Sequence, residues 1–246
     1  MALNISVSGV DDKQPRELWK TLKDYVFAPD SRSQQVKIGP SGIGDPCDKC
    51  VADTMSLMLP GKVHTPSPGG LKAFFGTGFH LLMQERVTEF AMGQKTRLKI
   101  LAESQFDIAE IPGYGTIRGT TDCLFDTTVF DWKTSDRPKI GKYRLKGVPN
   151  NYRYQAHMYG LGATLAGHTV EWVSLVFFPR DSNDTRDIWQ HVEPFNPEMA
   201  RRAIARAATI WDDFVLAGRT NELDSDLDCW RCKGFGVPVS ITLEQD

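Results

Sequence analysis

The segment Phe130–Ser135, which reads FDWKTS, lies within a run of strand-forming residues, TVFDWKT at positions 128–134. Side chains two positions apart in a strand point to the same face, so Asp131 and Lys133 would share one pocket. The polar end of an ordinary strand can contain the same pair of residues. The choice between a catalytic site and a plain strand end therefore depends on the rest of the sequence.

Two further strand-like segments precede this one, LKILAESQFDI at 98–108 and GTIRGTTDCLF at 115–125. The turn signals IPGYG and FDTT join the three segments. Three consecutive strands with short turns favour an antiparallel meander. The turn FDTT would then bring Asp122, near the end of the second strand, close to Asp131.

Helical and strand-like patterns surround these three strands and predict a mixed α/β sheet. The helical segment after the third strand is long enough to form a crossover, which favours parallel pairing of the third and fourth strands. The expected helices are 15–27, 51–59, 71–92 (interrupted or started near the glycines at 76–78), 150–167 and 197–218, and the expected further strands are 169–178 and 186–195.

The composition is that of a globular protein. With 246 residues, 41% hydrophobic and 24% charged, the chain can bury one core, and disordered, collagen-like and low-complexity classes are excluded. The net charge of -2 gives no overall attraction to nucleic acid. The N-terminus has no signal-peptide pattern and no segment is apolar enough to cross a membrane, so we expect a soluble protein of the cytoplasm, in a bacterium or a phage-infected host cell.

Paired carboxylates beside a lysine suit metal-assisted hydrolysis of a phosphodiester. Mg²⁺ prefers oxygen ligands and is usually held by one or two carboxylates, which Asp122 and Asp131 would supply. Lys133 would orient the attacking water or offset developing charge. His80, a polar ring within the apolar helix 71–92, could complete a site that also accepts Mn²⁺, or it could be a hydrogen-bonded core residue.

Four motifs in a fixed order give the chain a resemblance to a known family. GTGFH at 76–80, GTTD at 119–122, DWKT at 131–134 and QAHMY at 155–159 resemble the RecB-like branch of the PD-(D/E)XK nuclease superfamily, including exonucleases of the CRISPR-associated type. The resemblance implies a restriction-endonuclease-like mixed sheet flanked by helices. It also implies a single nuclease domain, 1–246.

The resemblance assigns roles to particular residues. His80, Asp122 and Asp131 would bind the catalytic Mg²⁺ or Mn²⁺, with the backbone carbonyl of Trp132 as a further ligand. Lys133 would be the catalytic lysine. The side chain of Trp132 would face away from the ion into the core.

The same resemblance places Gln155 and Tyr159, one helical turn apart, along the DNA channel.

Two other features follow from the residues themselves. Glu103 lies in the first strand beside the predicted hairpin, and we expect it to act only outside the first shell of metal ligands. The segment RPKIGKYRLKGVPNNYRYQ at 137–155 is rich in basic and aromatic residues and is expected to contact DNA as a loop, although a solvated basic loop would look the same.

The cysteines form two CxxC pairs, Cys47 with Cys50 and Cys229 with Cys232. Four thiolates suit either tetrahedral Zn²⁺ or a 4Fe-4S cluster. The fifth, Cys123, follows Asp122 on a strand and is expected to point into packing. The predicted metal centre would join the two ends of the chain across a nuclease core at about 71–217, as an appendage made of 40–60 and 225–240.

The division of the cysteines differs from that of the family. Related nucleases with an iron-sulfur cluster in this place use one upstream and three downstream cysteines, whereas this chain has two and two. We nevertheless expect a 4Fe-4S cluster, because the position matches and Cys50 could supply the missing ligand, with Zn²⁺ as the alternative.

The predicted function is a metal-dependent DNA exonuclease that acts on ends or single strands in recombination, repair or phage replication. It would work alone or with a separate helicase or recombination protein, because the chain has no P-loop. Two alternatives share parts of the pattern: a DNA-binding or recombination-partner module that does not cut, and a site-specific endonuclease with the same core.

Overall fold

The computed structural model describes residues 15–26, 37–62, 71–93, 99–226, 229, 231 and 232. Its centre is a mixed five-stranded sheet in which the strands lie in sequence order. The strands are β1 (Ile100–Ile111), β2 (Gly115–Phe125), β3 (Thr128–Ser135), β4 (Trp172–Pro179) and β5 (Trp189–Pro194). β1 to β3 form the predicted antiparallel meander, β3 and β4 are parallel, and β5 is antiparallel to β4. The predicted α/β fold class is confirmed.

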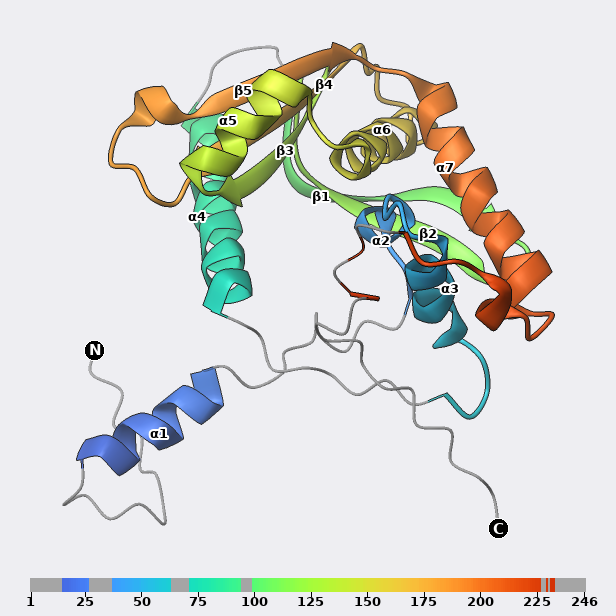
Figure 1. Ribbon diagram of the computed structural model, residues 1–246. Coiled ribbons are helices and arrows are strands. Elements are labelled where there is room, and N and C mark those ends of the chain that lie inside the picture. Colours follow the sequence, from blue (N-terminus) through green and yellow to red (C-terminus); the bar gives the residue numbers. More distant parts are fainter. Residues whose placement is uncertain are drawn as a thin grey trace.

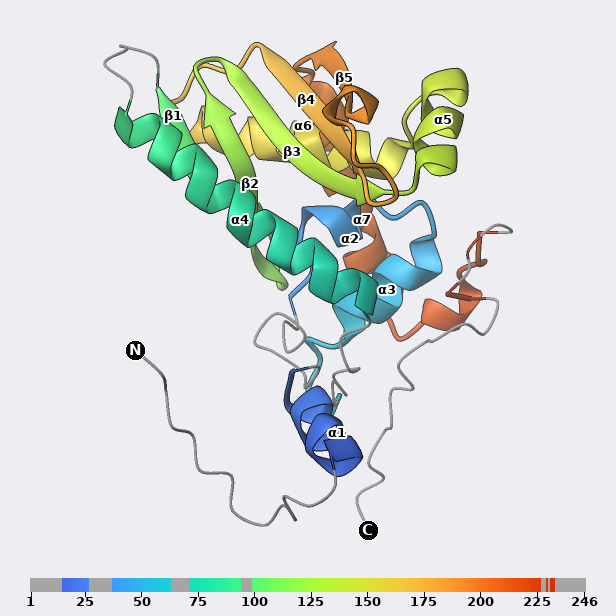
Figure 2. The same ribbon diagram turned by 90° about the vertical axis from the view of Figure 1, so that its left-hand side faces the viewer.

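Helices cover both faces of the sheet. Figure 2 shows α4 running across one face, with α6 on the opposite face, and Figure 1 shows α7 packed outside α6. The helices are α1 (Pro15–Val26), α2 (Pro40–Ile43), α3 (Asp48–Ser56), α4 (Leu71–Gly93), α5 (Arg137–Lys146), α6 (Asn150–Leu165) and α7 (Pro197–Ile210), and a π-helical turn, Trp211–Val215, extends α7. Of the predicted cysteine appendage, residues 227, 228, 230 and 233–240 lie outside the described part of the chain.

The helix α4 is continuous from Leu71 to Gly93, whereas the sequence predicted that it is interrupted or starts near its glycines at 76–78. Gly76 and Gly78 each cost a helix about 1 kcal/mol relative to alanine. Packing of Phe79, Met83 and Val87 against the sheet offsets this cost. Within the described residues no helix combines the length and the apolar character that crossing a membrane requires.

The basic segment after β3 is not a loop over its whole length. Its first part forms α5, which begins after Asp136 and has a proline in its first turn. Ile140 and Tyr143 bury their side chains, which gives the helix a tertiary anchor. The helix ends at Gly147, whose φ of 87° lies in the left-handed region that favours glycine. Because the segment is rich in basic residues, its sequence did not indicate that Ile140 and Tyr143 would be buried.

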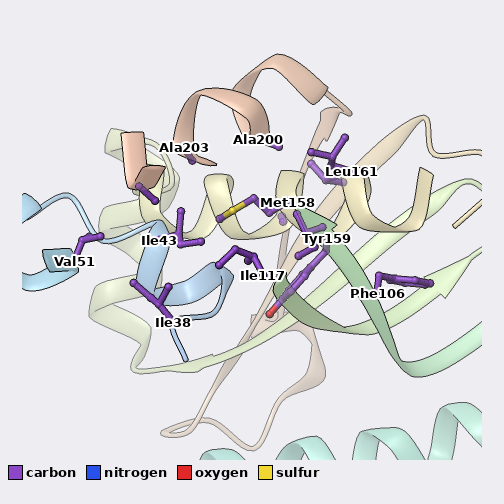
Figure 3. Packing of buried hydrophobic residues seen from close by; sticks show 14 of the residues in the cluster. Ile38, Ile43, Val51, Phe106, Ile117, Met158, Tyr159, Leu161, Ala200 and Ala203 are labelled. Atoms are coloured by element: carbon purple, nitrogen blue, oxygen red, sulfur yellow. The ribbon is translucent and has the colours of Figure 1, made fainter. Parts of the chain in front are cut away.

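The hydrophobic core has a large and a small part, one on each face of the sheet. The large part fills the space between the sheet and α6, where Ile117 and Met158 are fully buried (Figure 3). The small part lies under α4 and contains Cys123 and Trp132. Because β3 is covered on both faces, polar side chains on it are withdrawn from water, and Asp131 is 2% exposed.

A close approach between β2 and α6 depends on Gly119. A Cβ atom at this position would lie 2.7 Å from Cε1 of Tyr159, 2.8 Å from Cδ1 of Ile108 and 2.8 Å from Cγ of Pro40. These distances are shorter than any van der Waals contact between carbon atoms. The glycine of GTTD is therefore needed so that the tyrosine of QAHMY can pack against the strand.

Gly119→Ala is predicted to lower the free energy of unfolding by about 1–3 kcal/mol, because the added methyl group overpacks this contact. Gly141→Ala, in α5, is the matched control, since nothing lies within 4 Å of its Cβ position. The control is expected to be neutral or slightly stabilising. Urea unfolding measures both, and equal midpoints for the two variants would contradict the steric explanation.

Candidate active site

The candidate site begins where β2 and β3 separate. Their pairing runs only from Cys123–Phe125 to Thr128–Phe130. Two positions after Phe130, the backbone N–H of Trp132 donates a hydrogen bond of 2.5 Å to Oδ2 of Asp122. The Asp122 carboxylate thus accepts the hydrogen bond that a backbone carbonyl of a paired strand would accept. This bond fixes the orientation of the carboxylate, and Asp122 is only 7% exposed to solvent.

His80 reaches this carboxylate from α4. Its Nδ1 lies 3.1 Å from Oδ1 of Asp122, so the two oxygens of the carboxylate have different partners. The hydrogen bond with Asp122 raises the pKa of His80, although burial acts in the opposite direction. The structure therefore pairs the histidine and the aspartate that the sequence proposed as metal ligands.

Glu103 of β1 joins this pair. Ligand atoms of His80, Glu103 and Asp122 all lie within 4.8 Å of one another, a spacing at which one cation could bind all three. The backbone of Glu103 has a φ of 45°, in the left-handed region that non-glycine residues rarely adopt. The sequence predicts Glu103 beside the hairpin but not as a metal ligand, and its distance from the other two residues makes binding of the same cation geometrically possible.

Asp131 lies outside that set of three and next to Lys133. Nζ of Lys133 is 2.8 Å from its Oδ2, but the angle leaves Oδ2 without a hydrogen bond from any described residue. Burial raises the pKa of Asp131 to about 6, against the lowering effect of Lys133 and with a further raising effect of Asp122. A buried, incompletely paired carboxylate beside the site fits the binding of a cation.

Gln155 and Tyr159 hold the lysine rather than facing an open channel. Nζ of Lys133 donates to Oε1 of Gln155 at 2.9 Å, and Nε2 of Gln155 donates to the hydroxyl of Tyr159 at 2.7 Å. The two α6 residues are only 8% and 7% exposed. Their contacts support a role in positioning Lys133, whereas the predicted contact with DNA stays a prediction.

The side chain of Trp132 lies on the opposite face of β3, in the small core under α4. It is 9% exposed and stacks on Phe130, with ring centroids 5.4 Å apart. Cys123 is buried in the same cluster, and burial raises the pKa of its thiol to about 12. Both side chains therefore serve packing, as expected, and the metal contact of the Trp132 carbonyl stays a prediction.

The other four cysteines meet at a second site. Sγ of Cys50 lies 3.4 Å from that of Cys229 and 3.5 Å from that of Cys232, and Sγ of Cys47 lies 3.6 Å from that of Cys232. All four sulfur atoms are within 4.8 Å of one another, and none forms a disulfide. Burial raises the pKa of Cys50, so four thiolates together would require a cation.

Charged contacts attach this cysteine site to the rest of the fold. Arg206 of α7 donates from Nε to Asp48 at 2.6 Å and from Nη2 to the carbonyl of Asp45 at 2.7 Å. Arg231, between the two downstream cysteines, lies 3.6 Å from the carboxylate of Asp45. The cysteine site thus connects the segment before α3 with the end of the described chain.

Comparison with known proteins identifies the fold. No protein-family model matches the chain, and no curated protein does. The chain is similar to a crystal structure of an alkaline exonuclease, LHK-Exo, from Laribacter hongkongensis, with 14% identity, a TM-score of 0.52 and coverage of 81% of this chain and 95% of that one. A structure of LHK-Exo in complex with dAMP matches with 15% identity, a TM-score of 0.51 and coverage of 76% and 91%. At this identity the likeness shows a shared fold.

Mn²⁺ is predicted to raise the thermal unfolding temperature by at least about 3 °C at pH 7.5 and by much less at pH 5. The raised pKa of Asp131 means that its stabilising contribution is complete below its ordinary value of 3.8 and is lost as the pH rises through about 6. A cation restores this loss only where the carboxylate is ionised. Thermal melts at both pH values measure the effect, and a shift that is equal at pH 5 and 7.5 would contradict it.

Proposed function

We propose that this protein is a metal-dependent DNA exonuclease of the PD-(D/E)XK type. The observation that carries the proposal is the convergence of His80, Glu103 and Asp122 beside the buried pair of Asp131 and Lys133. The shared fold with an alkaline exonuclease, one structure of which is a complex with dAMP, supports a nucleic-acid substrate. In this proposal residues 1–246 form one nuclease domain of the RecB-like branch, with the cysteine site as an appendage.

The residues of the site would divide the work of phosphodiester hydrolysis. His80, Glu103 and Asp122 would hold a Mg²⁺ or Mn²⁺ ion, and Asp131 would complete its ligands with the carbonyl of Trp132. The bound ion would polarise the scissile phosphate and lower the pKa of a water.

Lys133 would act on the attacking water and on the phosphate, not on the metal ion. Its ammonium group can orient the attacking water and offset the negative charge that develops on the phosphate. Gln155 accepts a hydrogen bond from this ammonium and Tyr159 holds Gln155, so the pair would keep the lysine in place during the reaction. The buried ion pair with Asp131 fixes the lysine from the other side.

The substrate would be DNA, taken from an end or as a single strand. The helix α5 brings Arg137, Lys139 and Lys142 to the region after β3, where they can follow a phosphate backbone. A role in recombination, repair or phage replication, with a separate helicase or recombination protein, would agree with this chemistry. A DNA-binding module that does not cut and a site-specific endonuclease are the alternatives.

The purified protein is predicted to degrade end-labelled linear DNA in the presence of Mg²⁺ or Mn²⁺ and to leave closed circles intact. Asp131→Asn is expected to abolish cleavage, and Glu103→Gln to lower the rate by about 100-fold or more, because outer contacts alone account for 10- to 100-fold at metal sites. Glu110→Gln is the matched control, since Glu110 lies exposed on the same strand β1.

Each alternative function has its own outcome in this assay. Binding of DNA without cleavage under any metal would support the module that does not cut. Efficient cutting of closed circles would support the endonuclease. A Glu103→Gln variant as active as Glu110→Gln would remove Glu103 from the proposed metal ligands and leave the nuclease proposal in place.

For the cysteine site we propose a single structural Zn²⁺ ion rather than the 4Fe-4S cluster that the family position suggested. A tetrahedral zinc ion with Zn–S bonds of about 2.3 Å holds its sulfur ligands about 3.8 Å apart. The sulfur distances of 3.4 to 3.6 Å are close to this value. In a 4Fe-4S cluster each thiolate binds a different iron, which requires a wider spacing than the 4.8 Å that encloses all four sulfurs.

Purified protein is predicted to be colourless and to contain about one zinc ion per chain. Cys229→Ser should lower both the zinc content and the thermal unfolding temperature, because the ion joins the segment before α3 to the end of the described chain. Cys123→Ala, which removes a buried cysteine outside the site, should keep the zinc. Elemental analysis decides the question: a brown protein with about four iron atoms per chain would refute the zinc assignment.

A further inference from the structure

A pocket of about 510 Å³ lies beside the candidate active site. Its walls come from the first half of α4, from the ends of β3 and β4, and from the segment 182–188 that leads to β5. Its volume is within the roughly 300–1,000 Å³ that is usual for small-molecule sites. The residues used below are Phe75, Phe79, Thr134, Phe178, Arg180 and Asn183.

Three phenylalanines give the pocket an aromatic wall. Phe75 and Phe79 are four residues apart and so lie on one face of α4. The rings of Phe79 and Phe178 have centroids 4.7 Å apart, and Trp132 supports Phe178 from the core at 6.1 Å. Phe75 is 56% exposed, so its ring is accessible to a planar ligand. A flat aromatic group is the ligand that such a wall binds best.

The rim of the pocket is polar, and its two charged groups, Arg180 and Asp184, are each paired with an opposite charge. Arg180 contributes a guanidinium group that Asp136 fixes through a bond of 2.9 Å from Nη2. Asp184 also lines the pocket, but Arg186 donates to its carboxylate from Nε and Nη2 at 2.6 to 3.0 Å, which neutralises its charge. Thr134 and Asn183 add a hydroxyl and an amide group. The aromatic wall and polar rim together match a nucleotide.

The pocket adjoins the proposed metal ligands at α4, where Phe79 directly precedes His80. On β3, Thr134 directly follows Lys133, so its side chain points to the opposite face of the strand, the face that α4 covers. The pocket therefore lies next to His80 along the helix and on the other face of β3 from Lys133.

Resting on the proposed nuclease function, we propose that the pocket receives an unpaired base of the DNA strand, next to the scissile phosphate. In a duplex both faces of a base are covered by its neighbours, so only a single-stranded or frayed nucleotide can place its face against Phe75. The pocket thereby selects unpaired nucleotides over intact duplex. It selects them without regard to sequence, because every base offers a stacking face.

The test uses single-stranded oligonucleotides with 2-aminopurine as the terminal base, in a Ca²⁺ buffer. Stacking on Phe75 is expected to quench the fluorescence of 2-aminopurine. Phe75→Ala should remove the quenching and weaken binding by about tenfold, and Phe75→Trp should restore both. Phe90→Ala is the matched control, since Phe90 is 46% exposed on the same helix and does not line the pocket.

A second substrate separates base recognition from general damage to the fold. With an abasic terminal nucleotide, wild type and Phe75→Ala should bind equally weakly, because the group that stacks is absent. Thermal melts of both variants confirm that the half-exposed position leaves the fold intact. The pocket proposal is overturned if 2-aminopurine fluorescence is quenched equally by the Phe75→Ala and Phe90→Ala variants. It is also overturned if Phe75→Ala loses as much affinity for the abasic strand as for the strand with a terminal base.

Different results would refute the pocket proposal and the nuclease proposal. Quenching that depends on Phe75 in a protein that cuts no DNA would retain the pocket and reject the nuclease. If the protein cuts DNA with a metal, but the Phe75→Ala and Phe90→Ala variants quench and bind equally well, the nuclease proposal stands and the pocket proposal is rejected. Neither result can be mistaken for the other, because the fluorescence assay requires no cleavage.

Discussion

The hydrogen bond from the Trp132 N–H to the Asp122 carboxylate is the contact on which the rest of the site depends. It ends the ladder between β2 and β3 and replaces a backbone acceptor by a charged one, which makes a stronger hydrogen bond. The second oxygen of the carboxylate is then free to meet His80 from the opposite side. The neighbouring strand β1 contributes Glu103, because the register of β1 and β2, with Ala102 opposite Cys123 and Ser104 opposite Thr121, places Glu103 beside Asp122.

Burial imposes the next constraint. Asp131 and Lys133 lie in a strand that is covered on both faces, where a single charge would be costly and where removing one partner leaves the other uncompensated. Two hydrogen bonds, from Lys133 to Gln155 and from Gln155 to Tyr159, offset this cost. Gly119 provides the space that Tyr159 occupies, so the glycine of one motif and the tyrosine of another are parts of one packing arrangement.

The order and pairing of the strands were predictable, because periodicity, turn signals and the helical crossover after β3 report local geometry. The proximity of His80 and Asp122 was predictable only through the order of the motifs. The closeness of Glu103 to Asp122 depends on the exact register of β1 and β2 and on a left-handed backbone at Glu103, and neither has a clear signature in the sequence. The two CxxC pairs indicated a metal centre, but the distances between their sulfur atoms, which distinguish one ion from a cluster, depend on how Arg206 docks α7 against the segment before α3.

The proposed nuclease function requires that His80, Glu103 and Asp122 bind a single divalent cation. Anomalous diffraction from crystals soaked in Mn²⁺ tests it most directly. One manganese peak is predicted within about 2.0–2.3 Å of a ligand atom of each of these three residues, with the Asp131 carboxylate as a further ligand. Absence of a peak at saturating Mn²⁺ near neutral pH, or a peak elsewhere with these three side chains unmoved, would contradict it.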